Sequence, residues 1–291
     1  MKRSAAETVV AIDWSGAKAA SGQRKHIWMA EWRGGEVTLT AGRRREELAD
    51  ALVRMAQETP RMVVGVDFCF SYPAWFVREK RCASAEEFWE MVTREGEQWL
   101  SAECADVRFW GAHRRKTPAE FVGERRERMF RRADLACKVR SRILEPTVRE
   151  RVKGIAPKSP FQIGGAGAVG TGSLRGIPLL ARLRAAGFSV WPFDEPRLPL
   201  LVEIYPRLLT GAVKKKNAEA RRLYLRARRK NDALFADVTG EAMREAAASE
   251  DAFDALVSVV EMARRRETFA GLRRAADAET LLEGDVWGAG S

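Results

Sequence analysis

Acidic residues that directly follow apolar runs are the groups of this chain best placed to do chemistry. Asp13 ends the stretch VVAID, Asp67 ends MVVGVD and Glu203 ends LLVE. The first two runs are short and rich in β-branched residues, which favours buried strands over helices. A strand buried on both faces has no solvated side for a charge, so its acid belongs at its end. We therefore expect three strands to deliver their acids to one place.

A further pair of acids, Asp251 and Asp254, opens the last strongly amphipathic segment of the chain. Residues three apart share one face of a helix, so both side chains can point in the same direction. An Asp near a helix N-terminus is also favoured by capping and by the helix dipole, which gives one of the pair a purely structural explanation. We expect Asp251 to be the cap and Asp254 to be the ligand.

Clustered carboxylates predict a divalent metal site. Acids brought together repel, and without a cation some of them would hold protons. Mg²⁺ or Mn²⁺ binds carboxylate oxygens together with water and substrate phosphate. Two such ions about 4 Å apart can activate a water and stabilise the leaving oxygen of a phosphoryl displacement. The predicted metal ligands are Asp13, Asp67, Glu203, Asp251 and Asp254, and all of them except Asp251 are also predicted to be catalytic.

The scarcity of histidine excludes other kinds of site. The chain has two histidines, His26 and His113, and its four cysteines form no CxxC pair. A zinc site of the Cys/His type therefore lacks its ligand spacing. With no secretory signal in view, the cysteines are expected to be reduced thiols of a cytoplasmic protein. No apolar run reaches the roughly 18 residues that a membrane span needs, so no membrane partner is expected.

Basic residues are concentrated in two segments. The net charge of the chain is +11, whereas 108–153 alone carries +9 and 211–230 carries +8. A nearly balanced body with two basic segments suits a polyanion, and we expect nucleic acid as the partner. Arginine on solvated helix faces is the alternative explanation of either segment. The candidate phosphate contacts in the second segment are Lys214, Lys215 and Lys216.

The hydrophobic pattern predicts an α/β fold. We expect a mixed sheet of five to six strands with helices on both faces, in which the first and fourth strands are neighbours. Their acids would then meet at the carboxyl ends of the strands, where open α/β sheets place their sites. The chain is expected to be a single domain, 1–291, with 74–155 as a helical insertion or cap. The expected strands are 9–12, 26–32, 36–40, 62–67, 188–193 and 200–205, and the main expected helices are 43–58, 173–186, 214–229 and 251–265.

Several motifs in order resemble a known family. The stretches AIDWSG, VGVDF followed by SYP, VEIYP and DAFDALVSVVEMARR, with SPFQIGGAGAVGTGSLRGIPLL between them, are similar to the RNase H-like family of predicted nucleases called domain of unknown function 429. The resemblance runs from about Val9 to Gly288. It implies an RNase H-like mixed sheet with an antiparallel second strand and metal-dependent phosphodiester cleavage. The acids it implies are Asp13, Asp67, Glu203 and Asp254, with Asp251 as an additional one.

Two other functions stay open at this point. The stretch Asp13–Lys18 is similar to the first phosphate loop of actin-like ATPases and sugar kinases, and the glycine-rich 164–172 could cradle phosphates or simply pack tightly. Lys18 and Arg175 are candidate substrate contacts beside these stretches. The chain lacks GxxxxGK[ST], so a P-loop is not expected. The alternatives are therefore a nucleotide-binding ATPase or phosphotransferase and a catalytically silent nucleic-acid-binding protein.

Overall fold

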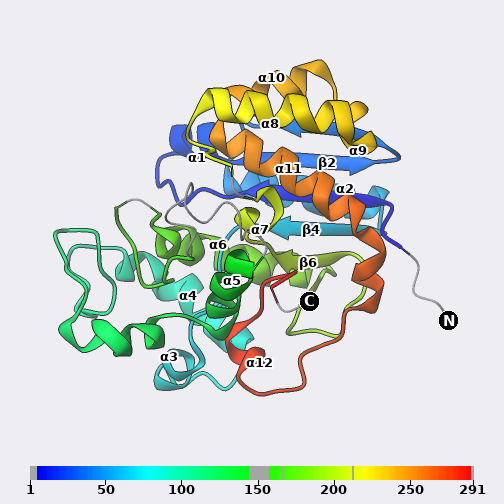
Figure 1. Cartoon of the computed structure of the whole chain (residues 1–291). Coiled ribbons are helices and arrows are strands. Elements are labelled where there is room, and N and C mark those ends of the chain that lie inside the picture. Colours follow the sequence, from blue (N-terminus) through cyan, green and yellow to red (C-terminus); the bar gives the residue numbers. More distant parts are fainter. Residues whose placement is uncertain (1–4, 144–156, 166, 212, 290–291) are drawn as a thin grey trace.

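A six-stranded mixed sheet forms the centre of the protein (Figure 1). The computed structural model describes residues 5–143, 157–165, 167–211 and 213–289. The strand order is β3-β2-β1-β4-β6-β5, with β2 antiparallel to β1 and β4 parallel to it. The α/β prediction and the expected neighbourhood of the first and fourth strands are confirmed. The strands are β1 (Thr8–Asp13), β2 (Trp28–Arg33), β3 (Glu36–Thr40), β4 (Met62–Val66), β5 (Ser189–Val190) and β6 (Leu200–Glu203).

The pairing of β1 with β4 brings two of the predicted acids together. Ile12 lies opposite Val66 in the parallel register, and the backbone N–H of Asp67 donates to the Ile12 carbonyl over 3.1 Å. Both strands are buried along their whole length, as their apolar, β-branched composition requires. Asp13 and Asp67 therefore leave the sheet side by side at its carboxyl edge.

Helices cover both faces of this sheet. On one face α2 (Arg45–Glu58), α4 (Ala85–Trp99) and α6 (Val169–Ala185) pack against β1 and β4 through one hydrophobic cluster. On the other face α11 (Glu250–Arg264) lies directly on the strands, and α8 (Ala218–Asn231) and α10 (Gly240–Ala248) lie outside it (Figure 1). Alternate residues of β1 belong to the two clusters, as a strand between two helical layers requires.

The described part of the helical insertion shares its core with the sheet. Tyr72, which follows β4, has its ring 5.6 Å from that of Phe88 in α4 and 5.2 Å from that of Phe161 beyond the insertion. All three belong to the cluster that also contains the β1 side chains. The insertion comprises α3 (Ala74–Glu79), α4, the 3-10 helices η1 (Ala119–Phe121) and η2 (Gly123–Met129), and α5 (Arg132–Ile143); its part from 144 to 155 lies outside the described residues.

Several element boundaries differ from the sequence prediction. The polar stretch before β2, for which the sequence predicted no helix, forms helix α1 (Ala20–His26), and its sequence ASGQRKH has no apolar periodicity that could have indicated it. Helix α6 begins at Val169 rather than at Ser173, since glycines in its first turns let it pack closely. A Cβ at Gly170 would lie 2.1 Å from the Pro160 carbonyl oxygen.

The remaining helices are short, and they connect the larger elements. None of the described helices is long and apolar enough to cross a membrane. The basic segment forms a helix from Ala218 rather than from Lys214, because Asn217 caps it by accepting from two backbone N–H groups. The short helices are α7 (Pro206–Thr210), α9 (Ala233–Ala236), η3 (Arg266–Gly271) and α12 (Thr280–Glu283).

Candidate active site

Three carboxylates from three elements converge at the carboxyl edge of the sheet. Asp13 is the last residue of β1, Asp67 follows β4, and Asp254 lies in the first turns of α11, which packs on β1. Asp13 is 8 % exposed and Asp254 is 2 % exposed. We call these three residues the acid cluster. The sequence predicted all three, and in the structure they lie close enough for the charges of Asp254 and Asp67 to act on Asp13.

Burial and mutual repulsion raise the pKa values of the acid cluster. Burial raises the pKa of Asp13 well above its usual value, and the charges of Asp254 and Asp67 raise it further. Burial also raises the pKa of Asp67 to about 7, although Lys215 opposes the shift. The pKa of Asp254 rises to about 6, again through burial and against the effect of Lys215. Acids in such a state gain by binding a cation.

An unpartnered oxygen marks the cluster as a place for a cation. Asp254 Oδ1 is buried and has no hydrogen-bond partner among the described residues, whereas Asp254 Oδ2 accepts from Lys215 Nζ. A buried carboxylate oxygen without a partner is costly, since it loses its water without compensation. Oxygen ligands of this kind suit Mg²⁺ or Mn²⁺. The chemistry of these side chains is therefore compatible with a bound cation.

Lys215 lies within the acid cluster. It belongs to the segment between α7 and α8, and its Nζ contacts Asp254 and lies 3.5 Å from Glu250 Oε1. Burial opposes its charge, but the carboxylates of Asp254, Asp13 and Asp67 raise its pKa above the usual value. From the sequence, Lys215 was predicted to contact phosphate, like Lys214 and Lys216. In the structure, its ammonium group instead pairs with Asp254 and is influenced by Asp13 and Asp67.

Arg221 fixes the backbone that carries Lys215. This arginine of α8 is 5 % exposed, and its guanidinium donates to the Lys215 carbonyl. It also donates to the carbonyls of Ala247, over 3.1 Å, and Ala248, over 2.8 Å, at the C-terminal end of α10. No pattern in the sequence predicted this role for Arg221. In the sequence nothing separates Arg221 from the exposed Arg222 beside it, because both belong to one basic run.

Asp251 is not the cap of α11. The cap is Ser249, whose Oγ accepts from the backbone N–H of Ala252 over 3.2 Å, so the expectation for Asp251 is wrong. The Asp251 carboxylate instead pairs with His26 Nδ1 of α1 at 2.8 Å. Its charge raises the pKa of Asp13. Asp251 therefore lies at the edge of the acid cluster, and its carboxylate binds His26.

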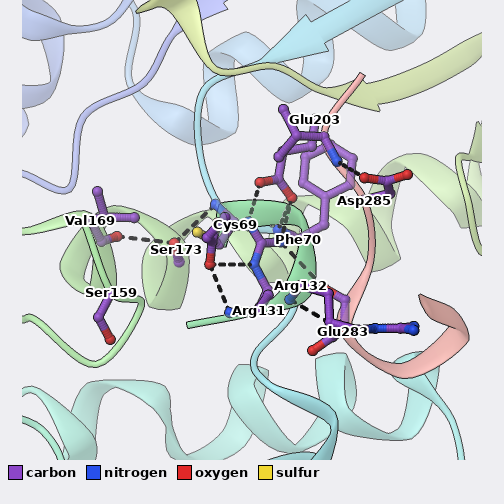
Figure 2. A network of polar contacts seen from close by, with 12 residues as sticks. Cys69, Phe70, Arg131, Arg132, Ser159, Val169, Ser173, Glu203, Glu283 and Asp285 are labelled. Atoms are coloured by element: carbon purple, nitrogen blue, oxygen red, sulfur yellow. Dashed lines mark hydrogen bonds and ion pairs between the residues drawn. The ribbon is translucent and has the colours of Figure 1, made fainter. Parts of the chain in front are cut away.

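Glu203 is held in a separate buried network, which Figure 2 shows. Its Oε1 accepts from Arg131 Nη2 at 2.5 Å, and its Oε2 accepts from Arg131 Nη1 at 2.7 Å and from the Phe70 N–H at 2.8 Å. Arg131 is fully buried and also pairs with Asp134 at 2.8 Å. Burial raises the pKa of Glu203, and Arg131 opposes this.

The prediction that Glu203 completes the acid cluster is therefore revised. Its charge still reaches Asp67, whose pKa it helps to raise. Both of its oxygens, however, are bound by a guanidinium and a backbone N–H. Arg131 comes from the insertion, 72 positions away in the sequence. No local signal at Glu203 could have indicated that partner.

The same network contains a buried group that could hold a metal ion. The ligand atoms of Cys69, Asp134 and Glu203 lie within 4.8 Å of one another. Arg131 pairs with both carboxylates and offsets part of their charge. Burial raises the pKa of the Cys69 thiol well above its usual value, which disfavours the thiolate that a metal would bind. The acid cluster is therefore the better candidate for a metal centre.

The turn after Asp13 is packed against α6. A Cβ at Gly16 would lie 2.7 Å from the backbone nitrogen of Gly172, so glycine is required there for close approach. Arg175 of α6 donates to the Gly16 carbonyl over 2.5 Å and pairs with Glu97 at 2.6 Å. Its guanidinium thus binds the protein itself rather than facing a substrate. Lys18, beyond the turn, is exposed.

Comparison with known proteins finds one family. The family model described as protein of unknown function (DUF429) matches residues 11–271. This range contains every residue of the acid cluster and Lys215. No curated protein and no solved structure matches the chain.

Proposed function

We propose that the chain, which belongs to the DUF429 family of proteins of unknown function, is a metal-dependent nuclease of the RNase H-like kind. The observation that carries the proposal is the convergence of Asp13, Asp67 and Asp254 at the carboxyl edge of a mixed sheet. Two of these acids are almost fully buried, and Asp254 has an oxygen without a partner. Because the function of this family is unknown, the proposal depends on the chemistry of this site.

Asp13, Asp67 and Asp254 are the residues that would hold Mg²⁺ or Mn²⁺. A bound ion of this type activates water and stabilises the charge that develops on a phosphodiester as it is cleaved. The side chains of the acid cluster bind through oxygen and lose their protons when they do so. Metal-assisted cleavage of this kind needs no histidine, which is consistent with a chain that has only two.

A basic surface on α8 and on the segment before it supports nucleic acid as the substrate. Arg222, Arg226 and Arg229 recur at helical spacing on α8, and all three are exposed. Lys214 and Lys216 are exposed on the segment that leads into this helix. A row of cations on one helix face suits the regular charges of a phosphate backbone. The α8 surface, as we call these five residues, follows directly from the Lys215 segment.

Cleavage assays with single substitutions test the proposal. The protein is incubated with Mg²⁺ or Mn²⁺ and single-stranded, double-stranded, hybrid and branched DNA and RNA. Asp13→Asn and Asp254→Asn are expected to reduce cleavage by more than about 100-fold, because each removes a metal ligand. Asp237→Asn, which changes an exposed acid outside the cluster, is the matched control and should cleave like the unmodified protein.

The outcomes separate the candidate functions. Cleavage that survives Asp13→Asn unchanged would contradict the site. Salt-dependent binding without cleavage in either metal would favour the silent nucleic-acid-binding protein. The nucleotide-dependent alternative has no support from the packed turn at Gly16, whose carbonyl accepts from Arg175.

A further inference from the structure

We propose that Lys215 is an internal counter-ion of the acid cluster, and that a divalent cation must displace its ammonium group in order to bind. This inference rests on the proposed function, since it assumes that Asp13, Asp67 and Asp254 are metal ligands. It assigns to Lys215 a role different from that of the exposed lysines on either side. The site would thus be closed by its own cation until a metal replaces it.

The contacts of Lys215 place its charge where a metal would lie. Its Nζ contacts Asp254 Oδ2 and lies 3.5 Å from Glu250 Oε1. The charges of Asp13 and Asp67 act on the same ammonium group. Lys215 is therefore the common partner of acids from β1, from the end of β4 and from α11.

One ammonium group does not satisfy this cluster. It carries one positive charge among three acids, and it leaves Asp254 Oδ1 without a partner. A divalent cation brings a second charge and takes several oxygens at once, at about 2.1 Å for Mg²⁺. The cation and Nζ cannot both bind the same oxygen at close range, because their like charges repel strongly in a buried site.

Only the side chain of Lys215 needs to move. Its backbone carbonyl is held by Arg221, which is anchored to the end of α10. The side chain is 28 % exposed, and Lys214 and Lys216 on either side are exposed. A lysine stem has four rotatable bonds, so a change of rotamer can carry the ammonium group from the acids to solvent. A fixed backbone with a free stem is what a displaceable counter-ion requires.

Mn²⁺ titrations of four proteins test this inference without any nucleic acid. Lys215→Met keeps the length of the stem and removes the charge, and we expect it to bind Mn²⁺ about tenfold or more tightly than the unmodified protein. Lys215→Arg keeps a cation and should stay near the unmodified affinity. Lys216→Met is the matched control for loss of a nearby charge and should change the affinity by less than about twofold. Equal or weaker binding by Lys215→Met would overturn the inference.

A labelling experiment on the unmodified protein gives a second readout that does not depend on a variant folding. Lysines are acetylated with an amine-reactive ester, with and without saturating Mn²⁺, and each site is quantified by mass spectrometry. We expect the modification rate of Lys215 to increase several-fold on Mn²⁺ binding, while those of Lys214 and Lys216 stay constant. A Lys215 rate that is the same in both states would also overturn the inference.

The two experiments distinguish this inference from the proposed function. Mn²⁺ binding with release of Lys215 but no cleavage of any substrate would uphold the counter-ion and contradict the nuclease. Cleavage that depends on Asp13, with Lys215 equally reactive in both states, would uphold the nuclease and contradict the counter-ion. Absence of Mn²⁺ binding in both the unmodified protein and Lys215→Met would contradict both.

Discussion

Asp13, Asp67 and Asp254 share one region of the protein with the ammonium group of Lys215. The same residue type behaves differently elsewhere in the chain, since the exposed Asp277 has its pKa lowered by Arg132. Burial is therefore what separates the acids of the cluster from ordinary surface carboxylates, and it does so by penalising their charged forms. Consequences for pH follow directly from these shifts.

The stability of the metal-free protein should carry the signature of Asp67. Its pKa is about 7 in the folded protein against a usual value of 3.8, so the folded state holds this proton more tightly than the unfolded state. The contribution of Asp67 is therefore most favourable below about pH 4 and is lost as the pH rises towards 7. We expect the melting temperature of the unmodified protein to fall relative to that of Asp67→Asn as the pH rises from about 4 to 7. Above pH 7 the difference between the two melting temperatures should stay constant.

Metal should act in the opposite direction at the same residue. Because Mg²⁺ competes with protons for these carboxylates, its stabilising effect should be larger at pH 8 than at pH 5. Thermal unfolding with and without Mg²⁺ at the two pH values measures this. An equal Mg²⁺ effect at both pH values, or an undiminished effect in Asp67→Asn, would count against Asp67 as a ligand.

At the scale of elements, the insertion and the last strand are joined by a buried ion pair. Glu203 ends β6, and Arg131 directly precedes α5. The two side chains bind each other through two hydrogen bonds and are 4 % and 0 % exposed. A buried charge without its partner is strongly unfavourable, so this pair fixes where α5 docks. Its role is therefore expected to be structural, in contrast to that of the acid cluster.

Glu203→Gln separates the structural role from a catalytic one. We expect it to reduce the free energy of unfolding by about 1–3 kcal/mol, since a Gln side chain offers Arg131 and the Phe70 N–H one acceptor oxygen in place of two, while Asp134 still balances the Arg131 charge. Arg222→Gln, which breaks an exposed pair with Glu219, should cost less than about 1 kcal/mol and is the matched control. Below its melting temperature, Glu203→Gln should bind Mn²⁺ with nearly unchanged affinity. Loss of Mn²⁺ binding in a folded Glu203→Gln protein would restore Glu203 as a ligand.

The packing of α11 on the sheet depends on Gly65 of β4. A Cβ there would lie 2.6 Å from Met262 Sδ and 2.8 Å from a methyl carbon of Ile204. Gly65→Ala is expected to destabilise the protein by about 1–3 kcal/mol, because the side chains of Met262 and Ile204 would have to shift from their packed positions. Gly271→Ala, where no atom lies within 4 Å of the added carbon, should change stability little. Denaturant unfolding of both variants measures the difference, and equal stability would show that these side chains adjust without cost.

At the scale of the whole molecule, the acid cluster and the α8 surface lie on different elements and differ in burial. The acids lie at the sheet edge, and the arginines lie on a helix outside α11 (Figure 1). The proposed contacts to a polyanion and the proposed metal ligands can therefore be changed separately. This separation gives a direct test of the surface.

Replacing Arg222, Arg226 and Arg229 with glutamine should weaken nucleic-acid binding. The slope of log affinity against log salt is expected to become shallower by about two to three, because each lost phosphate contact releases about one counter-ion fewer. The charge-matched control replaces Arg33, Arg54 and Arg94, which are exposed on other elements, and should leave the slope unchanged. Fluorescence anisotropy with a labelled oligonucleotide measures both. A slope equally reduced in the two triple variants would mean that total charge matters and the α8 surface does not.

The sequence by itself determined the sheet and two of its acids. Asp13 and Asp67 could be placed because a buried strand tolerates a charge only at its end, and this rule acts within a few residues. Asp254 followed from helical periodicity, which is equally local. The resemblance to domain of unknown function 429, which the family match over residues 11–271 confirms, implied the same three acids.

Only the tertiary structure decided which charges neutralise each other. Glu203 has the same sequence context as Asp13, yet Arg131 binds both of its oxygens. Lys215 has the same context as Lys214 and Lys216, yet it alone of the three contacts Asp254. Pairing between distant charges depends on how helices and loops dock, and no spacing along the chain encodes it. For that reason the positions of the acids could be read from the sequence, whereas their partners could not.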